Sequence, residues 1–168
     1  MKIIFSHGKE SGPWGSKIKR LADIAKQQGF AVDSIDYSGI TDPDLRVEKL
    51  LSVIENETDL MLVGSSMGGY VSLVASASQN VKAVFLLAPA LYLANYNIQE
   101  YSFSSVLTEV VHGWSDDIIP VENSIRFCQQ HCHSLHLIAG DHRLNSSIDT
   151  VATLFKQFLI KTKGSNKA

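Results

Sequence analysis

The chain has 168 residues, 45% of them hydrophobic, which suffices for one substantial buried core but is too short for two ordinary domains. Its 15 lysines and arginines against 17 aspartates and glutamates give a formal net charge of −2, so the chain lacks the basic field that binds nucleic acid or an anionic membrane. No apolar run approaches the roughly 20 residues that cross a bilayer, and the N-terminal residues turn polar too early for a signal peptide.

Short apolar runs alternate along the chain with stretches whose apolar residues recur at helical spacing. The apolar runs are largely continuous, as expected for parallel strands covered by helices on both faces. In chain order, we predict a strand at 2–5, a helix at 18–25, a strand at 30–37, a helix at 43–56, a strand at 60–65, a helix at 68–78, strands at 81–89 and 106–113, a helix at 121–130, a strand at 134–139 and a helix at 146–161. Right-handed crossovers between these elements predict a three-layer α/β/α sandwich with about six mostly parallel strands.

No repeat, linker or change of composition divides the chain. We therefore expect a single domain over residues 1–162, with residues 163–168 as a flexible C-terminal tail. The only cysteines, Cys128 and Cys132, lie four apart on one predicted helix and provide no disulfide framework. Two reduced thiols and no signal peptide are typical of a cytoplasmic protein.

A serine lies at the turn between the third predicted strand and the next helix. Residues 64–68, Gly-Ser-Ser-Met-Gly, fit the pattern G-x-S-x-G, in which the central serine occupies a strained turn with its hydroxyl exposed. We call this turn, residues 64–68, the elbow. The absence of side chains at Gly64 and Gly68 lets the strand and helix approach this turn. We therefore predict that Ser66 is a nucleophile and that the Met67 backbone N–H faces a developing oxyanion. The alternative is a small-residue turn that binds phosphate at a helix N-terminus.

A serine hydroxyl needs a base to become a good nucleophile, and a histidine after a later strand would provide one. His142 follows the last predicted strand and precedes the last helix, so a parallel sheet would present it at the same edge as Ser66. The remaining histidines beyond the elbow are interpreted as surface, core or strand-end residues: His112, His131, His133 and His136.

The histidine in turn needs an acid that fixes its tautomer and stabilises its positive charge. Asp116 and Asp117 lie in the turn between the strand at 106–113 and the following helix. We favour Asp116, because one helix and one strand separate it from His142 and bring both loops to one edge. Asp117 is expected to cap the helix or face water. Asp141, next to the histidine in the chain, is poorly placed to receive its ring N–H.

The loop after the first strand is expected to provide a second donor for the oxyanion. Residues just beyond His7 and Gly8 can turn their N–H groups toward the serine, and Lys9 is the predicted donor. The alternative is that these residues only end the strand and begin an ordinary turn.

Aromatic residues lie in segments close to this predicted site. The segment 91–104 contains Tyr92 and Tyr96 and is interpreted either as a short lid over an acyl pocket or as part of the core. Trp14 and Tyr70 are further candidate pocket residues. Because the chain has no room for a cap domain, we expect a small, open site that prefers short acyl groups.

These motifs resemble those of the α/β-hydrolase superfamily, and in particular its small, cap-less bacterial serine hydrolases, the YqiA-like esterases. The resemblance rests on SHGKESGPWGSK at 6–17, GSSMGGY at 64–70, HGWSDDIIP at 112–120 and GDHRL at 140–144. The chain order Ser, Asp, His is also that of this superfamily. The resemblance implies a minimal α/β-hydrolase fold and cofactor-free hydrolysis of small carboxylic esters or thioesters through an acyl-enzyme. The residues it implies are Ser66, Asp116 and His142 as the triad and the N–H groups of Lys9 and Met67 as the oxyanion hole.

Two other classes of protein stay open. One is a binding module that keeps the fold without turnover. The other is a metal site built from Cys128, His131, Cys132, His133 and His136, although no second cysteine pair follows at a zinc-finger spacing. We expect no metal, no cofactor and a small-molecule acyl substrate as the partner. The oligomeric state is not indicated, and the elbow specifies a nucleophile without choosing among ester, thioester and amide.

Overall fold

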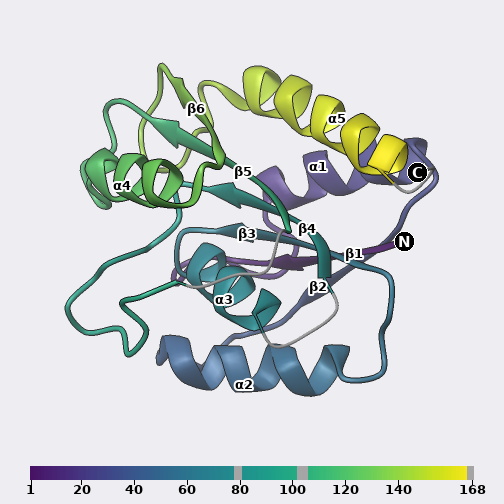
Figure 1. The fold of residues 1–168 in the computed structure, drawn as a ribbon, viewed down its shortest axis with the longest axis horizontal. Coiled ribbons are helices and arrows are strands. Elements are labelled where there is room, and N and C mark those ends of the chain that lie inside the picture. Colours follow the sequence, from purple (N-terminus) through teal and green to yellow (C-terminus); the bar gives the residue numbers. More distant parts are fainter. Residues whose placement is uncertain (78–80, 102–105, 166–168) are drawn as a thin grey trace.

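The computed structural model describes residues 1–77, 81–101 and 106–165. In chain order the elements are β1 (Lys2–Ser6), α1 (Ser16–Gln27), β2 (Ala31–Ile35), α2 (Pro43–Ile54), β3 (Leu60–Ser65), α3 (Met67–Ser76), β4 (Val81–Leu87), β5 (Leu107–Gly113), α4 (Val121–His131), β6 (Ser134–Ile138) and α5 (Ile148–Ser165) (Figure 1). The strands of these described residues form one sheet in the order β2-β1-β3-β4-β5-β6, and every neighbouring pair is parallel. The predicted three-layer α/β/α architecture is thereby confirmed.

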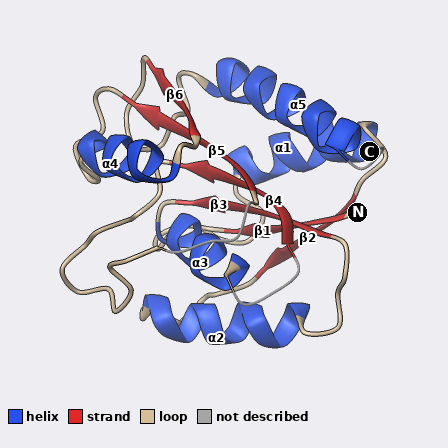
Figure 2. Ribbon diagram, in the orientation of Figure 1, coloured by secondary structure: helices blue, strands red, loops and turns tan. Residues whose placement is uncertain are grey.

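Helices cover both faces of the sheet (Figure 2). The helices α1 and α5 pack on one face, and α2, α3 and α4 pack on the other. Because successive side chains of a strand point to opposite faces, Phe85 of β4 packs with α5, whereas Val84 and Leu86 face the other core. This double burial is the physical reason for the continuous apolar runs at the centre of the sheet.

The strand order places the loops of several strands at one edge. β1 lies between β2 and β3 in the sheet, and the helices that follow β1 and β3 pack on opposite faces. At such a switch in strand order, the loops beyond the carboxyl ends diverge and leave room for a ligand. Since all strands run parallel, the loops after β5 and β6 end at the same edge.

The predicted ends of the elements lie within two residues of those described, except at the C-terminal ends of two helices. The predicted C-terminal end of the helix after Ser66, at residue 78, lies outside the described residues, and α3 is described to Ser76. The last helix continues through Ser165, so the flexible tail expected from residue 163 is helical over 163–165, and residues 166–168 lie outside the described residues. Thr162 is buried, and Lys163 donates to the Gln28 carbonyl oxygen, contacts that extend the packed part of α5. Among the described helices, none has the length and apolar character needed to span a bilayer.

Candidate active site

Ser66 lies in the sharp turn between β3 and α3. Its φ of 56° and ψ of −121° are rarely adopted by residues other than glycine. The turn is held from its surroundings: the Ser66 N–H donates to the Leu87 carbonyl oxygen (2.9 Å), and the Ser66 carbonyl oxygen accepts from the N–H groups of Gly69 (2.9 Å) and Ala90 (3.0 Å). These bonds keep the strained conformation in place and direct the hydroxyl away from the strand.

The glycines of the elbow are required by close packing. A Cβ at Gly64 would lie 2.1 Å from the carbonyl oxygen of Gly68, and a Cβ at Gly68 would lie 2.0 Å from that of Ser6 in β1. Both obstacles are backbone atoms, which cannot move aside without shifting a strand or helix. The pattern G-x-S-x-G therefore marks a turn pressed between β1 and α3.

The side chains of Ser66, His142 and Asp116 form a continuous hydrogen-bonded chain. His142 Nε2 lies 3.0 Å from Ser66 Oγ, and His142 Nδ1 lies 2.8 Å from Asp116 Oδ2. A carboxylate can only accept, so Nδ1 carries the hydrogen and the neutral ring accepts the serine O–H at Nε2. The three residues come from the loops after β3, β6 and β5, and the Asp116 side chain is fully buried while that of His142 is 17% exposed.

Asp116 is held by four donors. Its Oδ1 accepts from the backbone N–H groups of Ile118 (2.9 Å) and Ile119 (2.8 Å), and its Oδ2 accepts from His142 and from His112 Nε2 (2.8 Å). Burial by itself raises the pKa of Asp116, but the bonds from Ile119, His142 and Ile118 outweigh it and hold the pKa below its usual value. The carboxylate therefore stays ionised and receptive to the imidazole.

The two other aspartates considered for the acid lie elsewhere. Asp117 is exposed and lines the rim of the cavity described below. Asp141 Oδ1 accepts from the Leu144 backbone N–H (2.9 Å) and thus closes the turn before α5. Neither makes a hydrogen bond to His142 among those found in the described residues.

His112, interpreted from sequence only as a strand-end structural residue, contacts Asp116 directly. It is fully buried, and because its Nε2 must donate to the Asp116 carboxylate, its Nδ1 accepts from the Ser124 hydroxyl (2.7 Å). Burial lowers the pKa of His112 despite the opposing attraction of Asp116, so the ring stays neutral. The signal in the sequence was the spacing of four residues between His112 and Asp116 across the end of β5.

The loop after β1 lies beside Ser66. A Cβ built on Gly8 would lie 3.4 Å from the Cβ of Ser66, and Lys9 and Met67 line the same cavity as Ser66. Within the described part of the chain, no acceptor is found for the backbone N–H of Lys9 or of Met67. Two N–H groups are therefore available next to the serine.

A cavity of about 790 Å³ opens over Ser66 and His142. Its apolar lining includes Ile18, Pro43, Leu93, Tyr96 and Ile119, and its charged lining comprises Lys9, Glu10, Lys17, Asp117, Asp141 and Arg143. Positive and negative groups are balanced around it. Burial lowers the pKa of Lys17 to about 8, against the attraction of Asp141 and Asp116, while its Nζ donates to the Arg143 carbonyl oxygen (3.0 Å).

Of the four aromatic pocket candidates, Tyr96 lines the cavity and the other three do not. Tyr70 is buried and donates to Asp44 Oδ1 (2.6 Å), so it braces α3 against α2. The Tyr92 hydroxyl bonds to Gln130 on α4 (3.0 Å). Trp14 is a partly exposed surface residue. These three candidates do not line this cavity, because Tyr70 and Tyr92 bond to side chains of α2 and α4 and Trp14 lies at the surface.

The segment considered as a lid is anchored to the core at three of its described residues. Leu91, Tyr96 and Tyr101 are buried, and the Tyr101 ring meets Phe127 of α4 edge to face, with centroids 5.8 Å apart. Residues 102–104, with Phe103, lie outside the described residues. The described segment 91–101 therefore contributes Leu93, Asn95 and Tyr96 to the cavity wall and is joined to the core through its buried side chains.

The metal alternative finds no support in the described residues. Cys128 is buried and Cys132 is exposed, while His136 Nε2 bonds to Glu109 (2.8 Å) on the neighbouring strand. Nowhere in the ranges 1–77, 81–101 and 106–165 do three His, Cys, Asp or Glu side chains gather to share a metal ion.

Comparisons with known proteins agree with this geometry. The model of the uncharacterised protein family UPF0227 matches residues 2–101. A structure from Xanthomonas campestris pv. campestris assigned to the α/β-hydrolase superfamily superposes with a TM-score of 0.87 at 26% identity, covering 95% of this chain and 98% of that one. Est1E from Butyrivibrio proteoclasticus superposes with a TM-score of 0.82 at 19% identity, covering 96% and 88%. The expected resemblance to α/β hydrolases is confirmed for the fold.

Curated relatives match part of the chain. Human mitochondrial palmitoyl-protein thioesterase ABHD10 is 33% identical over 99 residues, which make up 52% of this chain and 32% of that protein. The chain thus aligns with about a third of the length of the curated relatives it matches. The structure of mouse α/β hydrolase domain-containing protein 10 superposes with a TM-score of 0.76 at 20% identity, covering 95% and 90%.

Proposed function

Since this chain belongs to the UPF0227 family and has the α/β-hydrolase fold, we propose that it is a serine hydrolase that cleaves small carboxylic esters or thioesters. The observation that carries the proposal is the hydrogen-bonded chain from Ser66 through His142 to Asp116. Support also comes from the strained elbow and from the two N–H groups beside it, because such donors stabilise a developing oxyanion.

In the proposed mechanism, Ser66 Oγ attacks the substrate carbonyl while His142 Nε2 takes its proton. Asp116 stabilises the resulting imidazolium, and the N–H groups of Lys9 and Met67 stabilise the tetrahedral oxyanion. The tetrahedral intermediate then collapses: His142 returns the proton to the departing alcohol or thiol as its bond to the carbonyl carbon breaks, and the acyl group stays on Ser66 as an acyl-enzyme. A water molecule activated by the same imidazole attacks this intermediate and releases the carboxylic acid.

The proposed substrates carry short acyl groups. The lining of the cavity includes apolar residues such as Leu93, Tyr96 and Ile119, and its volume of about 790 Å³ is typical of sites for small molecules. The human relative is named a palmitoyl-protein thioesterase, which supports thioesters as candidates beside esters. A panel of p-nitrophenyl esters from acetate to palmitate tests chain length: the proposal requires the highest kcat/KM at acetate or butyrate, and a preference for palmitate would contradict it.

A fluorophosphonate probe tests the proposed activity itself. We expect stoichiometric labelling of the wild-type chain and none of Ser66→Ala. Ser65→Ala is the matched control, because it removes the neighbouring hydroxyl and leaves the triad intact. If the wild-type protein stays unlabelled, the chain is better explained as a binding module with a hydrolase fold.

A further inference from the structure

A buried arginine on α2 points at the loop beside the nucleophile. Arg46 is 2% exposed, and in the described ranges no carboxylate pairs with it. A buried charge without a counter-ion is costly unless hydrogen bonds compensate for the lost water. The destination of those bonds therefore indicates what the residue does.

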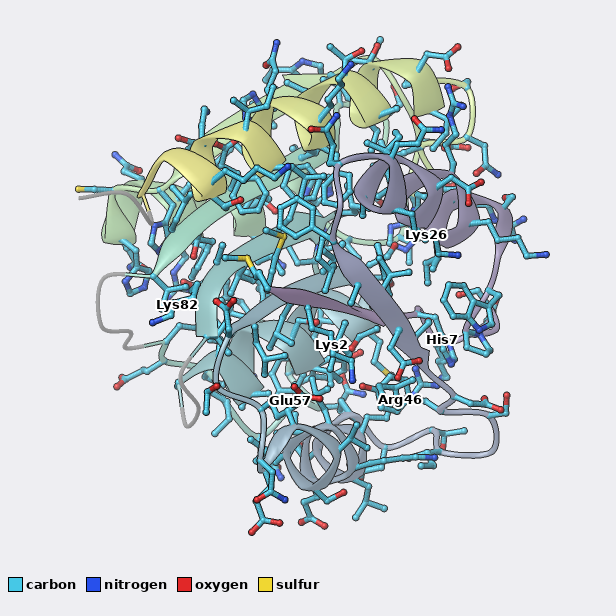
Figure 3. The ribbon with its side chains drawn as sticks, turned by 90° about the vertical axis from the view of Figure 1, so that its right-hand side faces the viewer. Lys2, His7, Lys26, Arg46, Glu57 and Lys82 are labelled. Carbon is cyan, nitrogen blue, oxygen red and sulfur yellow. The ribbon has the colours of Figure 1, made fainter. Side chains whose placement is uncertain are left out.

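The guanidinium donates only to backbone carbonyl groups in the bonds found. Its Nε donates to the Ile40 carbonyl oxygen (2.7 Å), and its Nη1 donates to the carbonyl oxygens of His7 (3.2 Å) and Gly8 (3.2 Å). The ring of Tyr37 supports the cation from one side, with its centroid 5.1 Å from Cζ. In Figure 3, Arg46 and His7 lie together between α2 and the end of β1.

The His7 side chain also bonds to the Gly8 carbonyl oxygen. Its Nε2 lies 3.0 Å from the Tyr37 backbone N–H, which can only donate, so Nε2 is the acceptor. Burial lowers the pKa of His7, and the neutral ring then carries its hydrogen on Nδ1. That hydrogen is donated to the Gly8 carbonyl oxygen at 2.7 Å. The Gly8 oxygen thus receives one bond from His7 and one from Arg46.

The Gly8 carbonyl and the Lys9 N–H belong to one peptide unit. A trans peptide is planar and its N–H points away from its C=O, and no cis peptide bond occurs in the described residues. Holding the carbonyl toward Arg46 and His7 therefore directs the Lys9 N–H to the opposite side of this peptide unit, and Lys9 is one of the residues that line the cavity with Ser66. The arginine charge beside the oxygen also polarises the peptide and strengthens its N–H as a donor.

We propose that Arg46 and His7 are positioning residues of the oxyanion hole, which clamp the Gly8 carbonyl and so present the Lys9 N–H to the oxyanion. This inference rests on the proposed function. It goes further by assigning a buried cation on α2 to the stabilisation of negative charge at the substrate. Arg46 acts through a peptide bond and touches no reacting atom.

The test compares Arg46→Met, Arg46→Lys and wild type by kcat and KM for p-nitrophenyl acetate and by affinity for a trifluoromethyl ketone. Ser66 Oγ adds to the carbonyl carbon of the ketone while its proton passes to His142 Nε2, and the carbonyl oxygen becomes a tetrahedral oxyanion. Arg46→Met should lower kcat about 10- to 100-fold, below the ~10² to 10³ lost with a whole donor, leave KM within about 2-fold, and weaken ketone binding by the same factor as kcat. Arg46→Lys, which keeps a cationic donor, should recover part of the loss.

The controls separate this inference from stability and from the proposed function. Lys49→Met removes a cation from the same helix whose Nζ bonds to the Asp36 carbonyl oxygen, and it should leave kcat and ketone affinity unchanged. If Arg46→Met does not fold, His7→Asn, which keeps a donor near the Nδ1 position, is compared with His7→Leu, and only His7→Leu should lose kcat.

Unchanged kcat and ketone affinity in folded Arg46 variants would overturn the clamp, as would a loss confined to thermal stability and KM. A wild-type protein that is neither labelled by fluorophosphonate nor active would overturn the proposed function instead.

Discussion

Two buried charges of opposite sign lie around Ser66, and the fold satisfies them differently. Asp116, beyond β5, accepts hydrogen bonds from two backbone N–H groups and from two imidazole rings. Arg46, on α2, donates to backbone carbonyl groups and reaches the site through the Gly8 peptide. Asp116 contacts the His142 ring directly, whereas one peptide unit separates Arg46 from the Lys9 N–H. The difference predicts large effects of mutation on the Asp116 side and graded ones on the Arg46 side.

The largest effect is expected from Asp116→Asn. An amide facing His142 would donate to Nδ1 and leave the hydrogen on Nε2, so the ring could no longer accept the serine proton. We expect kcat for p-nitrophenyl acetate to fall about 10⁴-fold with little change of KM. Circular dichroism verifies that the variant is folded. A loss of less than about 10-fold would show that the acid is unnecessary.

Gly68→Ala should disrupt the close packing of the elbow against β1. Its Cβ would lie 2.0 Å from the Ser6 carbonyl oxygen, so β1, with the loop that carries Lys9, must move away from the elbow. We expect a loss of about 3 kcal/mol or more in the free energy of unfolding, measured by urea denaturation. Gly12→Ala is the matched control, because a Cβ there meets nothing within 4 Å; equal stability of the two variants would refute the packing argument.

His112→Leu tests the second imidazole on the acid. Losing one bond to a buried carboxylate should raise the pKa of Asp116 and lower kcat roughly 10-fold. Ser124→Ala removes only the hydroxyl that orients His112, and its effect on kcat should be smaller. Full activity of His112→Leu would assign the residue to the core alone.

The last prediction concerns the dependence of stability on pH. Burial lowers the pKa of both His7 and His112 from the ordinary value of 6.5, so the unfolded chain takes up protons that the folded one resists. Stability is therefore complete above about pH 6.5 and declines as the pH falls below it, by up to about 1.4 kcal/mol per pH unit for each ring. Thermal unfolding from pH 8 to 5 measures the slope. Each His→Asn variant should reduce it, and a melting temperature that is flat over this range would contradict the two shifts.

The sequence analysis predicted that three side chains at the ends of parallel strands would lie close together, and they do. Ser66, Asp116 and His142 lie in short loops after β3, β5 and β6, and in a parallel sheet those loops share one edge whatever the details of packing. Strand periodicity and chain order were therefore enough to bring them together. Their roles in catalysis stay predictions until they are measured.

Strand periodicity and chain order could not predict where the side chains around the site point. Arg46 occupies what looks like an ordinary polar position of the amphipathic α2, and only the fold turns it inward toward the loop after β1. Tyr70 and Tyr92 were predicted to line the pocket, but hydrogen bonds to Asp44 and Gln130 direct them to other helices. Such contacts join elements far apart in the chain, and local patterns carry no record of them.

The most direct test is to trap the acyl-enzyme. The protein is mixed with p-nitrophenyl acetate, quenched in acid within the first turnover, and digested for peptide mapping by mass spectrometry. We predict one acetyl group on Ser66 in the wild-type chain and none after His142→Ala under the same quench. Acetylation of Ser65 alone, or rapid ester cleavage with no serine adduct in either protein, would contradict the account.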